Sequence, residues 1–345
     1  MLRRAIRGLV LCSVLVAPPA IAGLTSLSSL IVFGDSLSDA GNSGLLTQSA
    51  AGFTFPPPPY APGQYSNGPV AVQYLWNLYN PGAPGAFKPS LAGGTDYALG
   101  GATTGTVNFN VVSPNVPTPL QPVFANLGAA TQLQQFMSAP PAFDPASSLF
   151  VVWLTPNDVF YALTTGGSSG VVLPGMPAGA DLVTNAITNI AAIIQTLAAA
   201  GAQHFLVPNM PDLALTPAFL GNPVAPLLSD ITNAFNNGLA PVLDALDASL
   251  PIEIVQFDTA ALVANMVNNP GVFGFTNVTE SCVANLLNGR CDPSTWLFWD
   301  EVHPTTRTHE LFGLQFAQAV PEPAPLALIV IALAMLGLSR RREIR

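Results

Sequence analysis

The chain has 345 residues, enough for one large α/β domain or two smaller ones. Half of the residues are hydrophobic and only 8% are charged, against about 25% in an ordinary soluble domain. Between residues 23 and 320 three basic residues stand against 17 acidic ones, a net charge of −14. This balance argues against nucleic-acid binding, which needs a basic surface, and fits a protein kept soluble outside the cytoplasm.

The first 22 residues have the pattern of a secretory signal peptide. Three arginines within the first seven residues precede an apolar run over residues 9–16, and Ala20-Ile21-Ala22 stands before Gly23. This order predicts export, with cleavage after Ala22. The alternative is a short buried helix, which the order of the charges disfavours.

Downstream of residue 23 the apolar pattern alternates between strands and helices. Apolar runs of strand length occupy residues 29–33, 95–102, 148–154, 204–207 and 252–257. Helical patterns occupy residues 69–78, 127–137, 181–200, 224–248, 258–267 and 305–319. Long Pro-rich loops are expected over residues 43–69 and 103–125.

An alternation of buried strands and helices predicts a mainly parallel sheet with helices packed against it. We therefore expect an α/β fold, a three-layer α/β/α sandwich with a five-stranded sheet. The sequence shows no internal repeat and no clear linker, so we expect one domain over residues 23–319.

The first predicted strand runs into Gly34-Asp35-Ser36. An α/β protein displays reactive groups at such a junction, outside the carboxyl end of a strand. A serine in a turn indicates little by itself, because turns are rich in serine. A serine nucleophile also needs a base, an acid that orients the base, and hydrogen-bond donors for an oxyanion.

The candidate bases are the three histidines of the chain. His204 stands at a buried apolar strand and is expected to be structural, and His309 lies inside the last predicted helix as a surface or packing group. His303 lies in a loop before that helix, three residues after Asp300. A carboxylate at this spacing can accept from one imidazole nitrogen and leave the other facing Ser36. The alternative is that Asp300 only caps a turn.

Four stretches of the chain, in this order, resemble the sequence blocks of the GDSL, or SGNH, esterase and lipase family. They are Gly34-Asp35-Ser36-Leu37, Gly101 within residues 97–102, Asn157 within residues 155–158, and Asp300-Glu301-Val302-His303. The resemblance covers residues 28–318. It implies the flavodoxin-like fold of SGNH hydrolases and an ester hydrolysis that needs no metal or cofactor.

The resemblance also implies a role for each matching residue. Ser36 would be the nucleophile, His303 the base and Asp300 the acid that orients it. The oxyanion hole would consist of the backbone N–H groups of Ser36 and Gly101 and the side-chain amide of Asn157. Glycine allows the close backbone approach that this needs, and an asparagine amide donates without carrying charge.

Two positions depart from the family pattern. Thr155 stands where the family usually has glycine, and Asp96 stands where asparagine is usual. Neither change removes a predicted catalytic group, but the β-branched Thr155 puts the reach of Asn157 in question. Three other acids are expected to tie down turns: Asp35, Asp39 and Asp158.

Cys282 and Cys291 are the two cysteines that remain after removal of the signal peptide. In an oxidising compartment, two cysteines nine positions apart in a loop-like stretch predict a disulfide. The alternatives are two free thiols or half of a metal site, although no nearby histidine completes a zinc set.

The C-terminal residues 320–345 resemble a PEP-CTERM sorting signal of Gram-negative bacteria. Pro321-Glu322-Pro323 is followed by an apolar run over residues 325–338 and by three consecutive arginines from Arg340. The resemblance implies an exosortase as processing partner and transient membrane contact through residues 325–338. The alternative is a plain C-terminal membrane anchor. Either way we expect export to the periplasm, the outer surface or the extracellular matrix.

Together these patterns predict a secreted serine esterase or lipase that hydrolyses carboxylic acyl esters. The substrate would be an acyl ester, either lipid-like or an acetylated sugar, and no nucleic-acid partner is expected. The alternative enzyme is an exopolysaccharide O-acetyl esterase. The alternative outside the enzymes is a non-catalytic surface or matrix protein with the same fold.

Overall fold

The computed structural model describes residues 24, 26–170 and 181–320. In this part of the chain four strands form one parallel sheet in the order β1-β2-β3-β4. The strands are β1 (Ser29–Gly34), β2 (Ser148–Trp153), β3 (His204–Pro208) and β4 (Glu253–Phe257).

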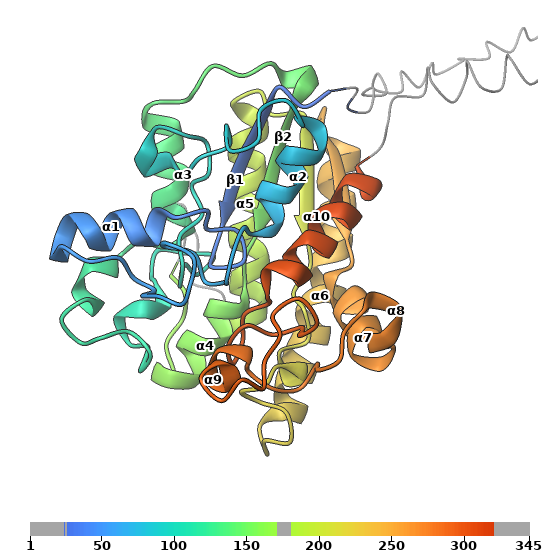
Figure 1. Cartoon of the computed structure of the whole chain (residues 1–345). Coiled ribbons are helices and arrows are strands. Elements are labelled where there is room, and N and C mark those ends of the chain that lie inside the picture. Colours follow the sequence, from blue (N-terminus) through green and yellow to red (C-terminus); the bar gives the residue numbers. More distant parts are fainter. Residues whose placement is uncertain (1–23, 25, 171–180, 321–345) are drawn as a thin grey trace, which may run out of the picture.

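Helices connect the strands and flank the sheet (Figure 1). The α-helices are α1 (Asn42–Ala51), α2 (Ala71–Tyr79), α3 (Ala129–Ser138), α4 (Pro156–Thr165), α5 (Leu182–Ala199), α6 (Ala225–Ser249), α7 (Thr259–Asn268), α8 (Pro270–Phe273), α9 (Cys282–Leu286) and α10 (Thr306–Ala319). Short 3-10 helices are η1 (Ser90–Ala92), η2 (Phe109–Val111), η3 (Gln121–Phe124), η4 (Pro145–Ser147) and η5 (Leu213–Leu215).

Strands β1, β2 and β3 are buried on both faces, whereas the edge strand β4 is only partly buried. Successive side chains point to opposite sides of the sheet, so each strand contributes to two cores. Ile31 and Phe150 pack into one core together with helices α3, α5 and α6. Val32 and Val151 pack into a second core together with helices α2, α7 and α10. The predicted α/β/α sandwich with a parallel sheet is therefore confirmed.

The predicted strand over residues 95–102 is wrong, and the sheet has four strands in the described chain rather than five. The segment lies beside β1 but is joined to it by a single parallel bridge, between Val32 and Asp96. Three backbone hydrogen bonds join the two segments, from Val32 N–H to Thr95 O, from Tyr97 N–H to Val32 O and from Leu99 N–H to Gly34 O, at 3.0, 2.8 and 3.2 Å. The ladder is interrupted because the N–H of Gly34 donates to the side chain of Gln132 at 3.0 Å. The segment borders β1 without continuing the ladder.

Helix α1 lies in a segment that the sequence predicts as a loop, and helix α4 lies in a segment for which no helix is predicted. The amino end of α1 is held by the Asp39 carboxylate, which accepts the N–H groups of Gly41, Asn42 and Ser43 at 2.9, 2.6 and 3.1 Å. Helix α4 begins at Pro156, whose missing N–H and fixed φ suit the first helical position. Both helices therefore begin directly beside the predicted site.

Helix α5 is long and apolar enough to cross a membrane by length and composition, with a mean hydropathy of 1.5. Half of this helix is buried inside the domain. Because it packs against α6 in the first core, it is a core helix of the sandwich.

The two predicted sorting segments lie outside the described residues. The signal peptide covers residues 1–22, and of the C-terminal segment over residues 320–345 the structure describes only Val320. The domain boundaries at residues 23 and 319 therefore stay predictions.

A disulfide joins Cys282 to Cys291, whose Cα atoms are 5.2 Å apart, as the sequence predicts. Cys282 begins α9 and packs with Trp296 and Trp299 in a small cluster of its own. Trp299 directly precedes Asp300, so the bridge anchors the chain next to the predicted acid.

Candidate active site

The turn after β1 presents Ser36 at the carboxyl end of the sheet. The carbonyl oxygen of Asp35 accepts the N–H of Asp39 at 3.0 Å and so closes the turn. Gln132 of α3 fixes the start of this turn. The side-chain oxygen of Gln132 accepts the N–H of Gly34 at 3.0 Å, and the side-chain nitrogen donates to the carbonyl oxygen of Gly34 at 2.8 Å. The serine side chain therefore projects from a backbone that is fixed on both sides.

The loop before α10 brings His303 to this serine. The Nε2 atom of His303 is 2.8 Å from Oγ of Ser36, and its Nδ1 atom is 2.8 Å from Oδ2 of Asp300. The three predicted residues thus form one continuous hydrogen-bond chain. In this geometry the imidazole can accept the serine proton at Nε2 while the carboxylate holds Nδ1–H.

Asp300 receives further hydrogen bonds. Its Oδ1 atom accepts the N–H groups of Val302 and His303 at 2.9 and 2.7 Å, and its Oδ2 atom accepts the Tyr60 hydroxyl at 2.8 Å. Burial by itself raises the pKa of Asp300, but the charge and hydrogen bonds of His303 and the backbone donors outweigh it and lower the pKa. The carboxylate therefore stays ionised beside the imidazole.

Two tyrosines belong to the site that sequence reasoning did not identify. Tyr60 donates to Asp300 and packs edge-to-face on Trp299, with ring centroids 5.8 Å apart. The ring of Tyr65 lies 5.1 Å from the imidazole of His303. Both come from the loop-rich segment 43–69, and a tyrosine after a proline run carries no signal for a partner 240 positions away.

The other two histidines have structural partners, as predicted. Nδ1 of His204 is 2.9 Å from a carboxylate oxygen of Glu253 on the neighbouring strand. Nδ1 of His309 accepts the N–H of Ala71 at 3.2 Å, and burial lowers the pKa of His309 to about 3. Within the described ranges, no three His, Cys, Asp or Glu side chains are grouped to hold a metal ion.

The three predicted oxyanion donors differ in how the structure places them. Among the described residues, the backbone N–H groups of Ser36 and Gly101 have no hydrogen-bond partner. Gly101 has φ +78°, and a Cβ atom there would collide with the Asn108 side chain, so the position requires glycine. Asn157 lines the same pocket as Ser36 and His303, whereas Gly101 is not among the described residues that line it.

The backbone at Thr155 has the conformation of a glycine, with φ 126° and ψ −36°. A β-branched residue rarely adopts a positive φ, because its branched Cβ crowds the backbone. Its Oγ1 atom is also buried without a hydrogen-bond partner in the described structure. The departure seen in the sequence is therefore accommodated by strain in the turn that carries Asn157.

The pocket beside Ser36 is small, with a volume of about 40 Å³. Asn157 and His303 provide polar groups at its wall, and the rest is mostly apolar. The apolar lining consists of Leu37, Pro156, Phe160, Pro211, Leu213, Val263, Leu297, Phe298, Val302, Pro304 and Phe312. A pocket of this size and polarity fits a short acyl group.

Three buried acids surround the serine turn. Burial raises the pKa of Asp35 to about 7, and its Oδ2 atom has no hydrogen-bond partner in the described structure. Burial likewise raises the pKa of Asp39 and of Asp158 to about 6, against the lowering effect of their hydrogen bonds. Asp158 accepts from the N–H and the hydroxyl of Thr104, so these acids tie loops together as predicted.

A family model described as GDSL-like lipase/acylhydrolase matches residues 30–316 of this chain. The chain belongs to this family. GDSL esterase/lipase proteins hydrolyse acyl esters, and the four sequence blocks of the resemblance all lie within the matched range.

Two curated proteins and one solved structure are similar to this chain. The chain is 30% identical over 329 residues to an uncharacterized protein from the trpE-trpG intergenic region of Pseudomonas putida, covering 90% of this chain and 51% of that protein. It therefore spans about half the length of that relative. It is 25% identical over 344 residues to a GDSL esterase/lipase of Arabidopsis thaliana, covering 90% of each chain. A crystal structure of a putative GDSL-like lipase from Parabacteroides merdae matches with a TM-score of 0.44 at 14% identity, covering 88% of this chain and 99% of that one.

For this GDSL-family chain we predict that Thr155→Gly increases the free energy of unfolding by about 1–2 kcal/mol, because it relieves the strain of a positive φ. Urea denaturation measures the change. The matched control is Thr118→Gly, at an exposed loop position with ordinary backbone geometry, which should be neutral or slightly destabilising. The prediction is contradicted if the free energy of unfolding of Thr155→Gly decreases as much as that of Thr118→Gly.

A second prediction concerns the Tyr60 hydroxyl. Tyr60→Phe keeps the ring contact with Trp299 but removes one donor to Asp300, so kcat/KM for a small ester should fall about tenfold, as for a lost hydrogen bond to a charged group. Tyr161→Phe, a tyrosine outside the pocket, should leave kcat/KM unchanged. Equal kinetics of the two variants would show that the hydroxyl has no part in positioning Asp300.

A third prediction concerns pH and stability. The pKa of Asp35 is raised from 3.8 to about 7, so between these values the native state binds the proton more tightly than the unfolded chain. Stability should therefore decrease as pH rises from about 4 to about 7, and Asp35→Asn should flatten this decrease. Asp230→Asn, an exposed acid, is the control. A wild-type stability that rises steadily over this interval would contradict the prediction.

Proposed function

We propose that this protein is an exported serine esterase that hydrolyses carboxylic esters with Ser36 as the nucleophile. The observation that carries the proposal is the hydrogen-bond chain from Ser36 through His303 to Asp300, with both steps at 2.8 Å. Membership of the GDSL-like lipase/acylhydrolase family supports the same reaction class.

In the first half of the reaction, Oγ of Ser36 attacks the acyl carbon of the ester while Nε2 of His303 takes the serine proton. Asp300 stabilises the resulting imidazolium through Nδ1–H. The tetrahedral intermediate then breaks its bond to the alcohol oxygen, and His303 returns the proton to that oxygen. The products of this half are a free alcohol and an acyl group on Ser36.

In the second half, a water molecule attacks the acyl group with His303 again taking a proton. Collapse of this second intermediate releases the carboxylic acid and restores the Ser36 hydroxyl. In both halves the negative oxygen would accept hydrogen bonds from the N–H groups of Ser36 and Gly101 and from the Asn157 amide. The free N–H groups and the position of Asn157 in the pocket support this role.

The size of the pocket supports a short acyl group. A volume of about 40 Å³ with an apolar lining fits an acetyl or similarly short group better than a long lipid chain. This observation favours the second candidate function, a carbohydrate O-acetyl esterase, over a lipase. The chain of contacts at Ser36 disfavours a purely non-catalytic surface or matrix protein.

Export is part of the proposal. The signal-peptide pattern over residues 1–22 and the PEP-CTERM resemblance over residues 320–345 both direct the domain out of the cytoplasm. The disulfide between Cys282 and Cys291 supports an oxidising compartment. An exosortase-type enzyme would then process the C-terminal segment, with residues 325–338 in transient contact with the membrane.

The test compares full-length protein with Ser36→Ala on p-nitrophenyl acetate, butyrate and octanoate. We expect Ser36→Ala to lower kcat by about 10⁴-fold or more, and Asn157→Ala to lower it by about 10²–10³-fold through loss of one oxyanion donor. Activity should be highest on the acetyl ester. Ser138→Ala, on the exposed side of α3, is the control. If Ser36→Ala turns over these esters as fast as the wild type, the proposed function is wrong.

A further inference from the structure

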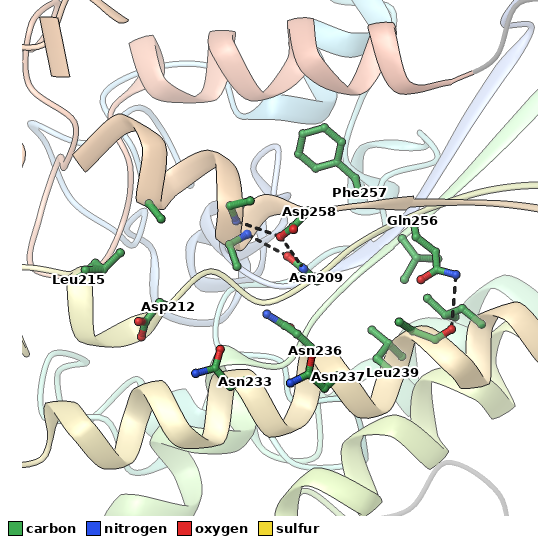
Figure 2. Close-up of a pocket in the computed structure, with 16 residues that line it drawn as sticks. Asn209, Asp212, Leu215, Asn233, Asn236, Asn237, Leu239, Gln256, Phe257 and Asp258 are labelled. Carbon is green, nitrogen blue, oxygen red and sulfur yellow. Dashed lines mark hydrogen bonds between the residues drawn. The ribbon is translucent and has the colours of Figure 1, made fainter. Parts of the chain in front are cut away.

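A second cavity lies beyond the carboxyl ends of β3 and β4, between α6 and α7 (Figure 2). Its volume is about 500 Å³, against about 40 Å³ for the pocket beside Ser36. A volume of this size lies within the range of small-molecule binding sites. None of the groups assigned to ester hydrolysis uses this cleft.

Amide side chains provide most of the polar lining of the cleft. Asn233, Asn236 and Asn237 project from one face of α6, at the helical spacing that places residues side by side. Asn209 after β3 and Gln256 of β4 complete the set on the other wall, as Figure 2 shows. An amide offers both a donor and an acceptor. Asn209 uses its amide on Asp258 and on the N–H of Ala260, and Gln256 donates to Asp244, so the open groups of the cleft are on α6.

The amides of α6 are not all used within the protein. Asn236 is fixed by two hydrogen bonds with the backbone of Met210, at 3.0 and 2.9 Å. Asn233 and Asn237 are exposed, and their side chains make no hydrogen bond within the part of the chain that the structure describes. They flank a fixed amide and leave their own donors and acceptors open toward the cleft.

The charge of the lining restricts the ligand. The cleft contains the carboxylates of Asp212 and Asp258, and none of its described lining residues is Lys, Arg or His. Phosphate, sulfate or carboxylate groups would therefore be repelled. Hydroxyl groups can donate to carboxylates and both donate to and accept from amides, and Leu239 and Leu243 of α6 add apolar lining. This combination fits a sugar or another polyol.

The cleft and the Ser36 pocket are neighbours, because Asp212 lines both. The short helix η5 separates them, with Leu213 on the side of the pocket and Leu215 on the side of the cleft. Helix α7 contributes to both in the same way, through Val263 and Ala264. The two cavities therefore share a border at Asp212.

We propose that the cleft binds the hydroxyl-rich alcohol part of the ester substrate, a sugar or polyol, while the acyl group occupies the pocket beside Ser36. The proposal rests on the proposed esterase function and specifies its substrate class. A short-acyl pocket beside a large polar cleft without basic side chains selects an O-acylated carbohydrate over an ester of a long apolar alcohol. Asn233 and Asn237 are the specificity residues of this cleft.

Binding without catalysis is the first test. Full-length Ser36→Ala is titrated with trisaccharides of glucose, mannose, galactose and xylose, and with glycerol, by calorimetry or NMR. At least one trisaccharide should bind, and adding Asn233→Ala and Asn237→Ala should weaken it about tenfold, as for the loss of two neutral hydrogen bonds. Asn268→Ala, an exposed asparagine of α7 outside the cleft, should have no effect.

Kinetics separate this inference from the proposed function. In otherwise wild-type protein, Asn233→Ala/Asn237→Ala should raise KM about tenfold for O-acetylated trisaccharides and leave p-nitrophenyl acetate hydrolysis unchanged. A similar effect on glycerol monoacetate would assign the cleft to a small polyol instead of a sugar chain. If p-nitrophenyl acetate is hydrolysed but no sugar or glycerol binds, or the double variant behaves like Asn268→Ala, the cleft proposal is wrong while the esterase proposal stands. Absence of any ester hydrolysis would instead overturn the esterase proposal.

Discussion

The Asp300 carboxylate accepts hydrogen bonds from four donors, and this set of contacts orients the imidazole of His303 toward Ser36. Two donors are backbone N–H groups of its own loop, so the carboxylate and the histidine move as one unit. The Tyr60 hydroxyl ties the same carboxylate to a loop near the other end of the chain. A buried carboxylate without such donors would take up a proton, and the imidazole would lose the partner that holds it.

The rest of the fold supplies the other side of this contact. The side-chain amide of Gln132 fixes Gly34 at the end of β1, and the closed turn of Asp35 then presents the serine. The disulfide at Cys282 and the packing of Trp299 hold the chain next to Asp300. Two cores, one on each face of the sheet, hold these segments in place. They thereby keep Ser36 in contact with His303, which lies 267 positions later in the sequence.

The sequence predicts the layers, the parallel sheet and the contacting set of Ser36, His303 and Asp300, because these depend on local apolar pattern and on short motifs. It does not predict that residues 95–102 fail to form a strand, since the Gln132 side chain that takes up the Gly34 N–H of β1 lies 98 positions away. It also misses Tyr60 and the amide cleft, because both arise from side chains that only the folded topology brings together. At Thr155 the sequence shows a departure from the family pattern, and only the structure shows its consequence, a positive φ in the turn before Asn157.

The most direct test of the account is covalent labelling of the full-length protein with a fluorophosphonate ester, followed by peptide mass spectrometry. Such a reagent reacts with a serine only when a neighbouring base activates it. The account predicts one adduct, on Ser36, with slow labelling in His303→Ala and no adduct in Ser36→Ala. Labelling of a different serine, or equal labelling of wild type and His303→Ala, would contradict it.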